Sequence, residues 1–262
     1  MRPATPGYKK LKYQESLQSI ENVINHLKMD ISNQKLEITF SGDLVAASGV
    51  GASAAQSTSL ARALNDTFNL NLDDGKINEA AYEGEKAYHG TPSGIDNTAS
   101  TFGGLIWFVK NLSGGENTME ILHSPKKVPL VIANTGITAS TTQVVSDVRS
   151  LKEANPKKFE EIFNEYKKLS VKAKKALLEG DFAKVGNLMK QNHSLLQRVT
   201  VSGAINDKLV DIALKNGALG AKMTGTGRGG LVIALVENEI IQKRIAKAIE
   251  KEGYDAWRTI IG

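Results

Sequence analysis

The sequence contains no cysteine, so disulfide bonds, thiolate zinc sites and cysteine nucleophiles are all excluded. It also has no apolar run near the roughly 20 residues that a bilayer-spanning helix needs. Residues 1–7 do not follow the charged, apolar and small-residue order of a secretory signal peptide. These absences predict a cytoplasmic protein without a membrane partner.

What is present is an ordinary globular composition of 262 residues, 41% of them hydrophobic, which suits one large domain or two small ones. The net charge is +5, and several of the lysines lie between positions 167 and 175, where they fit the solvated face of a helix. A basic balance also suits a protein that binds phosphates. The chain has no stripe of basic and aromatic residues, which is evidence against a nucleic-acid partner.

Apolar periodicity predicts a mixture of helices and strands without strict βαβ alternation, which indicates an α+β protein of two layers. A domain join is predicted near Ser124, dividing residues 1–124 from residues 125–262. The predicted helices are 8–29, 54–68, 77–89, 141–154, several from 156 to about 199, 205–215 and 240–250. The predicted strands are 36–40, 105–109, 119–122, 128–133, 231–236 and 257–261.

The first candidate site is a run of small residues between a predicted strand and a predicted helix: Ser48, Gly49, Val50, Gly51, Ala52, Ser53 and Ala54. Small residues allow backbone amides to approach an anion, and a helix N-terminus adds partial positive charge. The Ser53 hydroxyl is placed to ligate a magnesium ion on bound phosphates. The run lacks the Gly-Lys-Ser/Thr of a Walker A loop, and a purely structural glycine turn is the alternative.

The second candidate site is a pair of acids, Glu85 and Asp96, on either side of a tight turn rich in glycine and proline. We expect them to converge from the end of one helix and the start of the next. One acid could then hold a metal while the other accepts a hydroxyl proton, as phosphoryl transfer requires. The alternatives are a solvated helix carboxylate for Glu85 and a helix N-cap for Asp96.

The third candidate site precedes an apolar strand and consists of Gly225, Thr226, Gly227, Arg228 and Gly229. So many glycines indicate a backbone that passes close to a ligand or to another loop. A flexible hairpin turn is the alternative.

In this order the three runs resemble those of the GHMP family of small-molecule kinases. The middle run, E-G-E-K-A-Y-H-G-T-P-S-G-I-D-N at residues 83–97, is especially similar to the version in mevalonate kinases, and the resemblance covers nearly the whole chain. It implies a two-domain GHMP kinase fold, in which an N-terminal α/β domain is followed by a ferredoxin-like C-terminal domain with extra helices.

The resemblance also implies a reaction, the transfer of the γ-phosphoryl group of ATP to the 5-hydroxyl of mevalonate in isoprenoid biosynthesis. The first run would bind ATP, Ser53 and Glu85 would bind Mg²⁺, and Asp96 would be the catalytic base. Thr141 matches a family threonine near that aspartate, and the third run would support the phosphate loop. Another GHMP kinase, or a catalytically deficient nucleotide-binding relative or fragment, stays an alternative, and a homodimer is left open.

The chain departs from the family pattern chiefly at its start, where family members carry a strand-rich segment with a phosphate-contacting lysine and a Gly-Glu-His sequence. We expect several tens of residues of the N-terminal domain to be absent, through a fragmentary sequence, supply by another chain, or loss in a non-catalytic relative. Arg228 replaces a small residue and either touches phosphate or faces solvent. Ala139 and Thr142 stand where the family often has basic residues.

Overall fold

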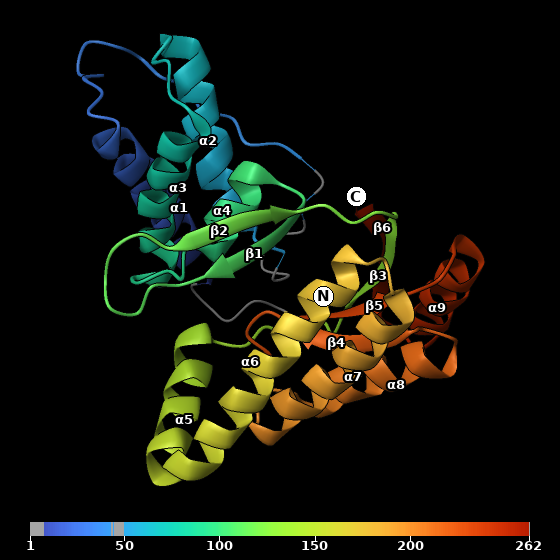
Figure 1. The fold of residues 1–262 in the computed structure, drawn as a ribbon. Helices are drawn as coiled ribbons and strands as arrows, with labels where there is room; N and C mark the ends of the chain where they lie inside the picture. The colour runs from blue at the N-terminus through green and yellow to red at the C-terminus, as the bar shows by residue number, and fades with distance from the viewer. Residues whose placement is uncertain (1–7, 43, 45–49, 262) are drawn as a thin grey trace. The chain divides into compact units, whose positions relative to one another are not determined.

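The computed structural model describes residues 8–42, 44 and 50–261 of the chain (Figure 1). These residues form two compact units, which we describe separately: an N-terminal unit that extends to Ile121 and a C-terminal unit that begins at Leu122. The division lies close to the join that the sequence predicts near Ser124. None of the helices in the described ranges is long and apolar enough to cross a membrane.

The N-terminal unit consists of four helices followed by a β-hairpin within its described residues. Its elements are α1 (Tyr8–His26), α2 (Ala52–Phe68), α3 (Asp74–His89), α4 (Ile95–Phe102), β1 (Leu105–Val109) and β2 (Thr118–Leu122). Helices α1, α2 and α3 share one apolar core, to which α1 gives Val23, α2 gives Leu60 and Leu64, and α3 gives Ile77. Among the described residues of this unit, the packing of these three helices therefore supplies the apolar core.

A close approach of α3 to α1 and α2 depends on Gly84. A Cβ atom at this position would lie 2.6 Å from the Ser57 hydroxyl oxygen of α2 and 2.9 Å from a methyl group of Val23 of α1. The Ser19 and Ser57 hydroxyls hydrogen-bond at 3.1 Å across the same contact. Because Gly84 directly precedes Glu85, this close packing also fixes the position of the candidate carboxylate.

The C-terminal unit is built on a four-stranded antiparallel sheet with strand order β4-β5-β3-β6. Its elements are β3 (Val128–Asn134), α5 (Thr141–Ala154), α6 (Pro156–Leu178), α7 (Phe182–Arg198), α8 (Ala204–Lys215), β4 (Gly220–Thr224), β5 (Leu231–Leu235), α9 (Glu239–Lys251) and β6 (Asp255–Ile261). Helices α8 and α9 cover one face of the sheet (Figure 1). The order β3-α8-β4-β5-α9-β6 gives the ferredoxin-like arrangement that the resemblance implies.

The additional helices α5, α6 and α7 pack around a second apolar cluster that contains Phe159, Ile162, Leu195 and Val199. Helix α7 also runs so close to strand β4 that a Cβ atom on Gly220 would lie only 2.0 Å from the Gly186 carbonyl oxygen. This contact connects the additional helices to the edge of the sheet.

Side-chain caps define where several helices begin. Asp73 accepts a hydrogen bond of 2.9 Å from the Lys76 amide at the start of α3, and Ser140 accepts one of 3.3 Å from the Gln143 amide at the start of α5. Such caps satisfy amides that have no partner within the helix. The Ser140 cap places Thr141 at the first position of α5.

Two strand assignments differ from the sequence prediction. The predicted strand at residues 36–40 is wrong, because no other strand in the described part of the chain pairs with this segment, and Phe40 is 43% exposed. Conversely, β4 was not predicted, because the glycine that α7 requires at position 220 weakens the strand pattern. Pairing with β5, from Gly220 opposite Leu235 to Thr224 opposite Leu231, makes β4 a strand.

Candidate active site

The described end of the first run lies at the N-terminus of α2. Gly51 is the N-cap in the left-handed conformation, with φ 71° and ψ 29°, and it makes no side-chain cap hydrogen bond. Amides in the first turn of a helix have no partner within the helix, and together with the helix dipole they attract anions. Val50, Ala52 and Ser53 are partly buried here and Ala54 is fully buried, whereas Ser48 and Gly49 lie outside the described residues.

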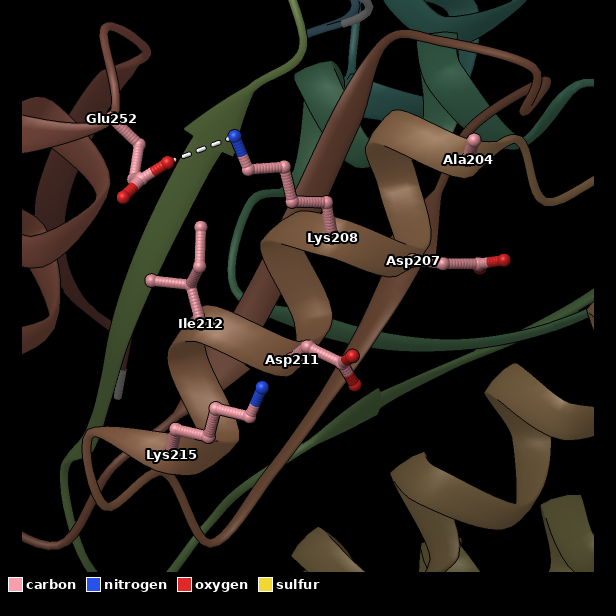
Figure 2. Close-up of a pocket in the computed structure, with 7 residues that line it drawn as sticks. All are labelled: Ala204, Asp207, Lys208, Asp211, Ile212, Lys215 and Glu252. Atoms are coloured by element: carbon pink, nitrogen blue, oxygen red, sulfur yellow. Dashed lines mark ion pairs between the residues drawn. The ribbon is translucent and has the colours of Figure 1, made fainter.

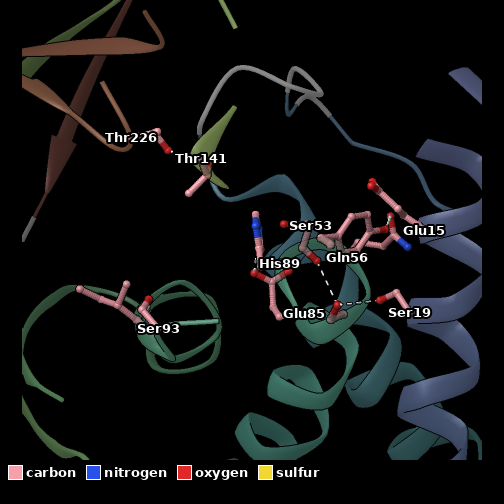
Figure 3. Close-up of polar contacts among 12 residues, drawn as sticks. Glu15, Ser19, Ser53, Gln56, Glu85, His89, Ser93, Thr141 and Thr226 are labelled. Atoms are coloured by element: carbon pink, nitrogen blue, oxygen red, sulfur yellow. Dashed lines mark hydrogen bonds and ion pairs between the residues drawn. The ribbon is translucent and has the colours of Figure 1, made fainter. Parts of the chain in front are cut away.

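Glu85 is a buried carboxylate on α3, with 1% of its surface exposed. Its Oε1 atom has no hydrogen-bond partner, and its Oε2 atom lies 3.8 Å from Nε2 of His89, one helical turn further on (Figure 3). Burial raises the pKa of Glu85 to about 7, a hydrogen bond with the Ser53 side chain lowers it, and the negative charge of Asp96 raises it further. The alternative of a solvated helix carboxylate is therefore wrong.

Asp96 lies in the first turn of α4 and is exposed. The N-cap of this helix is Gly94, with φ 90°, so the alternative role of Asp96 as an N-cap is wrong. Two contacts fix this turn: the Thr98 hydroxyl donates to the Gly94 carbonyl at 2.6 Å, and Asn97 Nδ2 donates to Asn78 Oδ1 of α3 at 2.6 Å. The exposed Asp96 carboxylate is thus held by a rigid element and influences Glu85.

A polar network connects the three helices around Glu85. The Tyr88 hydroxyl donates to Gln56 Oε1 at 3.1 Å, and Gln56 Nε2 donates to the Ser16 hydroxyl at 2.8 Å. Sequence reasoning missed these residues, although polar residues recurring on the inner faces of helices could have revealed them. The network fixes the helix faces that surround the carboxylate.

In the C-terminal unit, the third run forms a loop between β4 and β5, which we call the glycine-rich loop (residues 225–230). The Thr226 hydroxyl lies 2.9 Å from the hydroxyl of Thr141, and the two hydrogen-bond (Figure 3). At Gly227, with φ 86°, a Cβ atom would lie 2.1 Å from the Val201 carbonyl oxygen, and at Gly229 it would lie 2.5 Å from the Ile137 carbonyl oxygen. Close backbone approach, rather than flexibility, therefore accounts for these two glycines.

Asn206, a fully buried residue of α8 that sequence reasoning missed, holds the same loop. Its Nδ2 donates to the Gly229 carbonyl at 2.8 Å, and its Oδ1 accepts from the Gly229 amide at 3.0 Å and from the Gly203 amide at 3.3 Å. The sequence offered one indication of this role: Asn206 lies three residues after Gly203, at the start of a predicted helix, and a capping-box side chain at the N3 position binds the N-cap backbone.

The Arg228 side chain is partly exposed, but its guanidinium group binds other residues of the C-terminal unit. Its Nη1 donates to Asp147 Oδ2 of α5, and its Nε donates to the Thr200 carbonyl at 3.1 Å. Arg228 also adopts φ 50°, a conformation that L-residues seldom take. Its guanidinium group is therefore engaged by neighbouring elements of the same unit.

Two surface grooves of the C-terminal unit contain none of the predicted site residues. The larger, of about 520 Å³, lies over α8 and is lined by Asp207, Lys208, Asp211, Lys215 and Glu252 among others (Figure 2). Lys208 and Glu252 form an ion pair of 2.8 Å there. Charges of both signs in a wide, open groove do not define a ligand.

The residues around Glu85 fit a divalent cation of the magnesium type. Mg²⁺ prefers oxygen ligands and is usually bound through one or two carboxylates together with substrate phosphates. Glu85 offers a carboxylate oxygen without a partner, and Ser53 offers a hydroxyl. Among the described residues, no three His, Asp or Glu side chains form a metal cage, so a cation here would need phosphate oxygens as well.

Comparison with known proteins gives consistent matches along the chain. Residues 18–104 match the model of the GHMP kinases N terminal domain, and residues 173–255 match GHMP kinases C terminal. A mevalonate kinase of Thermococcus sibiricus is 31% identical over 248 residues, covering 92% of this chain and 72% of that protein. A mevalonate kinase of Pyrococcus furiosus is 32% identical with the same coverage. The crystal structure of L. major mevalonate kinase in complex with R-mevalonate superposes with a TM-score of 0.90 at 38% identity, covering 100% of this chain and 80% of that one.

Proposed function

Because the chain belongs to the mevalonate kinase branch of the GHMP kinase family, we propose that it transfers the γ-phosphoryl group of ATP to the 5-hydroxyl of mevalonate. The observation that carries the proposal is the state of Glu85. Its carboxylate is buried, has an oxygen atom without a hydrogen-bond partner, and is influenced by both Ser53 and Asp96. Perturbed acids in such an arrangement are typical of functional sites.

The N-terminus of α2 would bind the phosphates of ATP. Its first-turn amides and the helix dipole supply partial positive charge, and the left-handed Gly51 leaves no side chain above them. Ser53, in the first turn of the same helix, presents its hydroxyl beside the Glu85 carboxylate. When bound, Mg²⁺ would neutralise the oxygens between which the phosphoryl group moves, and Ser53 and Glu85 would hold it.

Asp96 would accept the proton of the attacking hydroxyl. It is exposed, so an alcohol can reach it, and the bonds within the first turn of α4 and to Asn78 restrict where its carboxylate can lie. A positioned general base typically contributes about 10²–10⁴ in rate. Most of the remaining acceleration in phosphoryl transfer comes from positioning and electrostatic stabilisation.

The alternative within the family is a kinase of another small alcohol. It is favoured by Ala139 and Thr142, which stand where basic residues are expected to contact mevalonate. Fewer cationic contacts would weaken the preference for a carboxylate-bearing alcohol. The substrate is therefore the part of the proposal that needs a direct test.

The test measures ADP release by the purified protein with ATP, Mg²⁺ and a panel of alcohols that includes mevalonate and phosphomevalonate. We expect mevalonate to give the highest kcat/KM, and Asp96→Asn to lower kcat by about 10²-fold or more. Asp66→Asn, which changes an exposed aspartate on α2, is the matched control and should leave kcat unchanged. Preference for another alcohol would support the alternative, and full activity of Asp96→Asn would contradict the proposed base.

A further inference from the structure

We propose that Arg228 is a positioning residue, which ties the glycine-rich loop to α5 through Asp147 and to the end of α7 through Thr200. The proposal deepens the proposed function and rests on it for its kinetic test. It assigns a role to the residue that departs most clearly from the expected pattern of small residues in this loop.

The guanidinium group of Arg228 bridges two neighbouring elements. Nη1 donates to the Asp147 carboxylate, Nε donates to the Thr200 carbonyl at 3.1 Å, and Nη2 lies 3.5 Å from the Thr200 hydroxyl. Asp147 also accepts from Gln143 Nε2 at 2.7 Å, so the carboxylate is itself oriented. Arginine presents donors in a rigid planar fork, which suits the bridging of two elements.

The backbone at Arg228 adopts a conformation that is costly for a non-glycine residue. Arg228 has φ 50° and Thr200 has φ 62°, so two non-glycine residues in left-handed conformations meet here. The Arg228 amide also donates to the Val201 carbonyl at 2.7 Å. Left-handed conformations cost L-residues about 1–2 kcal/mol each and persist where surrounding contacts hold them. A glycine would occupy position 228 without that cost, so the side chain accounts for the choice of residue.

Thr141 lies on the same helix as Asp147 and contacts the same loop. Its hydroxyl bonds to that of Thr226, and Asp147 lies six residues further along α5. Val144, between them, is buried, whereas Val148 and Leu151 pack into the cluster with α6 and α7. The N-terminal half of α5 is thus attached to the loop at two points, and Arg228 supplies the charged one. Loss of this point would let Thr141 shift relative to the loop.

A double-mutant cycle on kcat tests the coupling. Asp147→Asn should lower kcat by about tenfold, and Arg228→Gln, which also removes the bonds to Thr200, by about tenfold or more, while KM for ATP changes by less than about twofold. The double variant should lose no more kcat than Arg228→Gln alone, because the link to Asp147 is already absent in that variant. Arg228→Lys, which keeps the charge but not the fork, should retain an intermediate kcat. Multiplying losses in the double variant would overturn the proposal.

The same variants separate a positioning role from contact with phosphate. If Arg228 bound the nucleotide, Arg228→Gln would raise KM for ATP by about tenfold or more, and Asp147→Asn would leave KM unchanged or lower it by releasing the arginine. That pattern would overturn the proposal. Arg198→Gln is the matched control, because Arg198 forms a similarly exposed pair with Glu165 at 2.6 Å between α7 and α6, and this pair includes no residue of the loop.

Amide hydrogen exchange supplies a measurement that does not depend on activity. Arg228→Gln and Asp147→Asn should both accelerate exchange about tenfold in residues 141–148 and 224–230, with Arg198→Gln as wild type. Unchanged exchange in these segments would overturn the positioning role even in an active enzyme. Accelerated exchange in a protein without mevalonate kinase activity would support the link and contradict only the proposed function.

Discussion

The carboxamide of Asn206 hydrogen-bonds both the amide and the carbonyl of Gly229, at 3.0 and 2.8 Å. This arrangement resembles the pairing of two strands, with a side chain in place of the second backbone. Because Asn206 is fully buried, no water can replace these bonds without rearrangement of the loop.

We therefore predict that Asn206→Ala lowers the free energy of unfolding by about 2–4 kcal/mol, since it leaves three backbone groups of Gly229 and Gly203 without partners. Urea unfolding monitored by circular dichroism would measure the loss. Asn155→Ala, at an exposed asparagine, should change stability by less than about 0.5 kcal/mol. If Asn206→Ala also lowered the free energy of unfolding by less than about 0.5 kcal/mol, the loop would not depend on the Asn206 hydrogen bonds.

The sequence predicts an element well where the contacts that stabilise it are local in the chain, and poorly where they are not. Periodicity placed α2, α3, α5 and α8 within a few residues of their ends, because an amphipathic helix carries its own signal. A strand forms only when it pairs with another strand. The alternating pattern at residues 36–40 therefore predicted a strand that does not form, whereas β4 forms because it pairs with β5. The family resemblance supplied the ferredoxin-like arrangement that periodicity alone did not.

The candidate site shows the same division. The turn between Glu85 and Asp96 was evident from its glycines, and a helix start near Asp96 was expected. The burial of Glu85 was not evident, since it depends on the packing of α1 and α2 against Gly84. The bond between Arg228 and Asp147 joins residues 81 positions apart, and a single sequence gives no sign of such a pair.

The raised pKa of Glu85 predicts a pH dependence of stability in the absence of Mg²⁺. In the unfolded chain this acid ionises near pH 4.5, but in the folded protein it ionises at about 7. Its favourable contribution is therefore complete below pH 4.5 and is lost as the pH rises to about 7. At about 1.4 kcal/mol per pKa unit the loss amounts to about 3 kcal/mol.

Glu85→Gln removes this titration, so we expect the variant to be more stable than the wild type by up to about 3 kcal/mol at pH 8 without Mg²⁺. The difference should shrink towards pH 5, and thermal unfolding at several pH values would measure it. Glu79→Gln, at an exposed acid six residues earlier on α3, provides the control and should change stability by less than about 0.5 kcal/mol. Parallel stability profiles for wild type and Glu85→Gln would contradict the assignment.

Gly225 and Gly227 make a matched pair for testing close approach in the glycine-rich loop. Both have positive φ, 75° and 86°, but a Cβ atom at Gly225 meets nothing within 4 Å, whereas one at Gly227 would lie 2.1 Å from the Val201 carbonyl oxygen. Gly225→Ala should cost about 1–2 kcal/mol for the left-handed conformation alone. Gly227→Ala should cost at least about 2 kcal/mol more, measured by urea unfolding, because the backbone must move. Equal losses would mean that the loop relaxes freely at Gly227.

Lys222 gives the opposite pH dependence in the C-terminal unit. It lies on β4 between Ala221 and Met223, which face α8 and α9, so strand alternation directs it to the other face of the sheet, opposite Ile233. Burial lowers the pKa of Lys222 from 10.5 to about 8. Below pH 8 the lysine is charged in both states, and the folded protein bears a cost of about 3 kcal/mol that disappears as the pH rises from 8 to 10.5.

Replacement by a neutral chain of similar length should remove this cost. We predict that Lys222→Met raises the free energy of unfolding at pH 7 by up to about 3 kcal/mol, and that the gain falls towards zero near pH 10. Lys247→Met, at an exposed lysine of α9, should have little effect at either pH. If Lys222→Met were less stable than the wild type at pH 7, the ammonium group would have a stabilising partner. The cost of desolvating its charge would then not be the dominant effect.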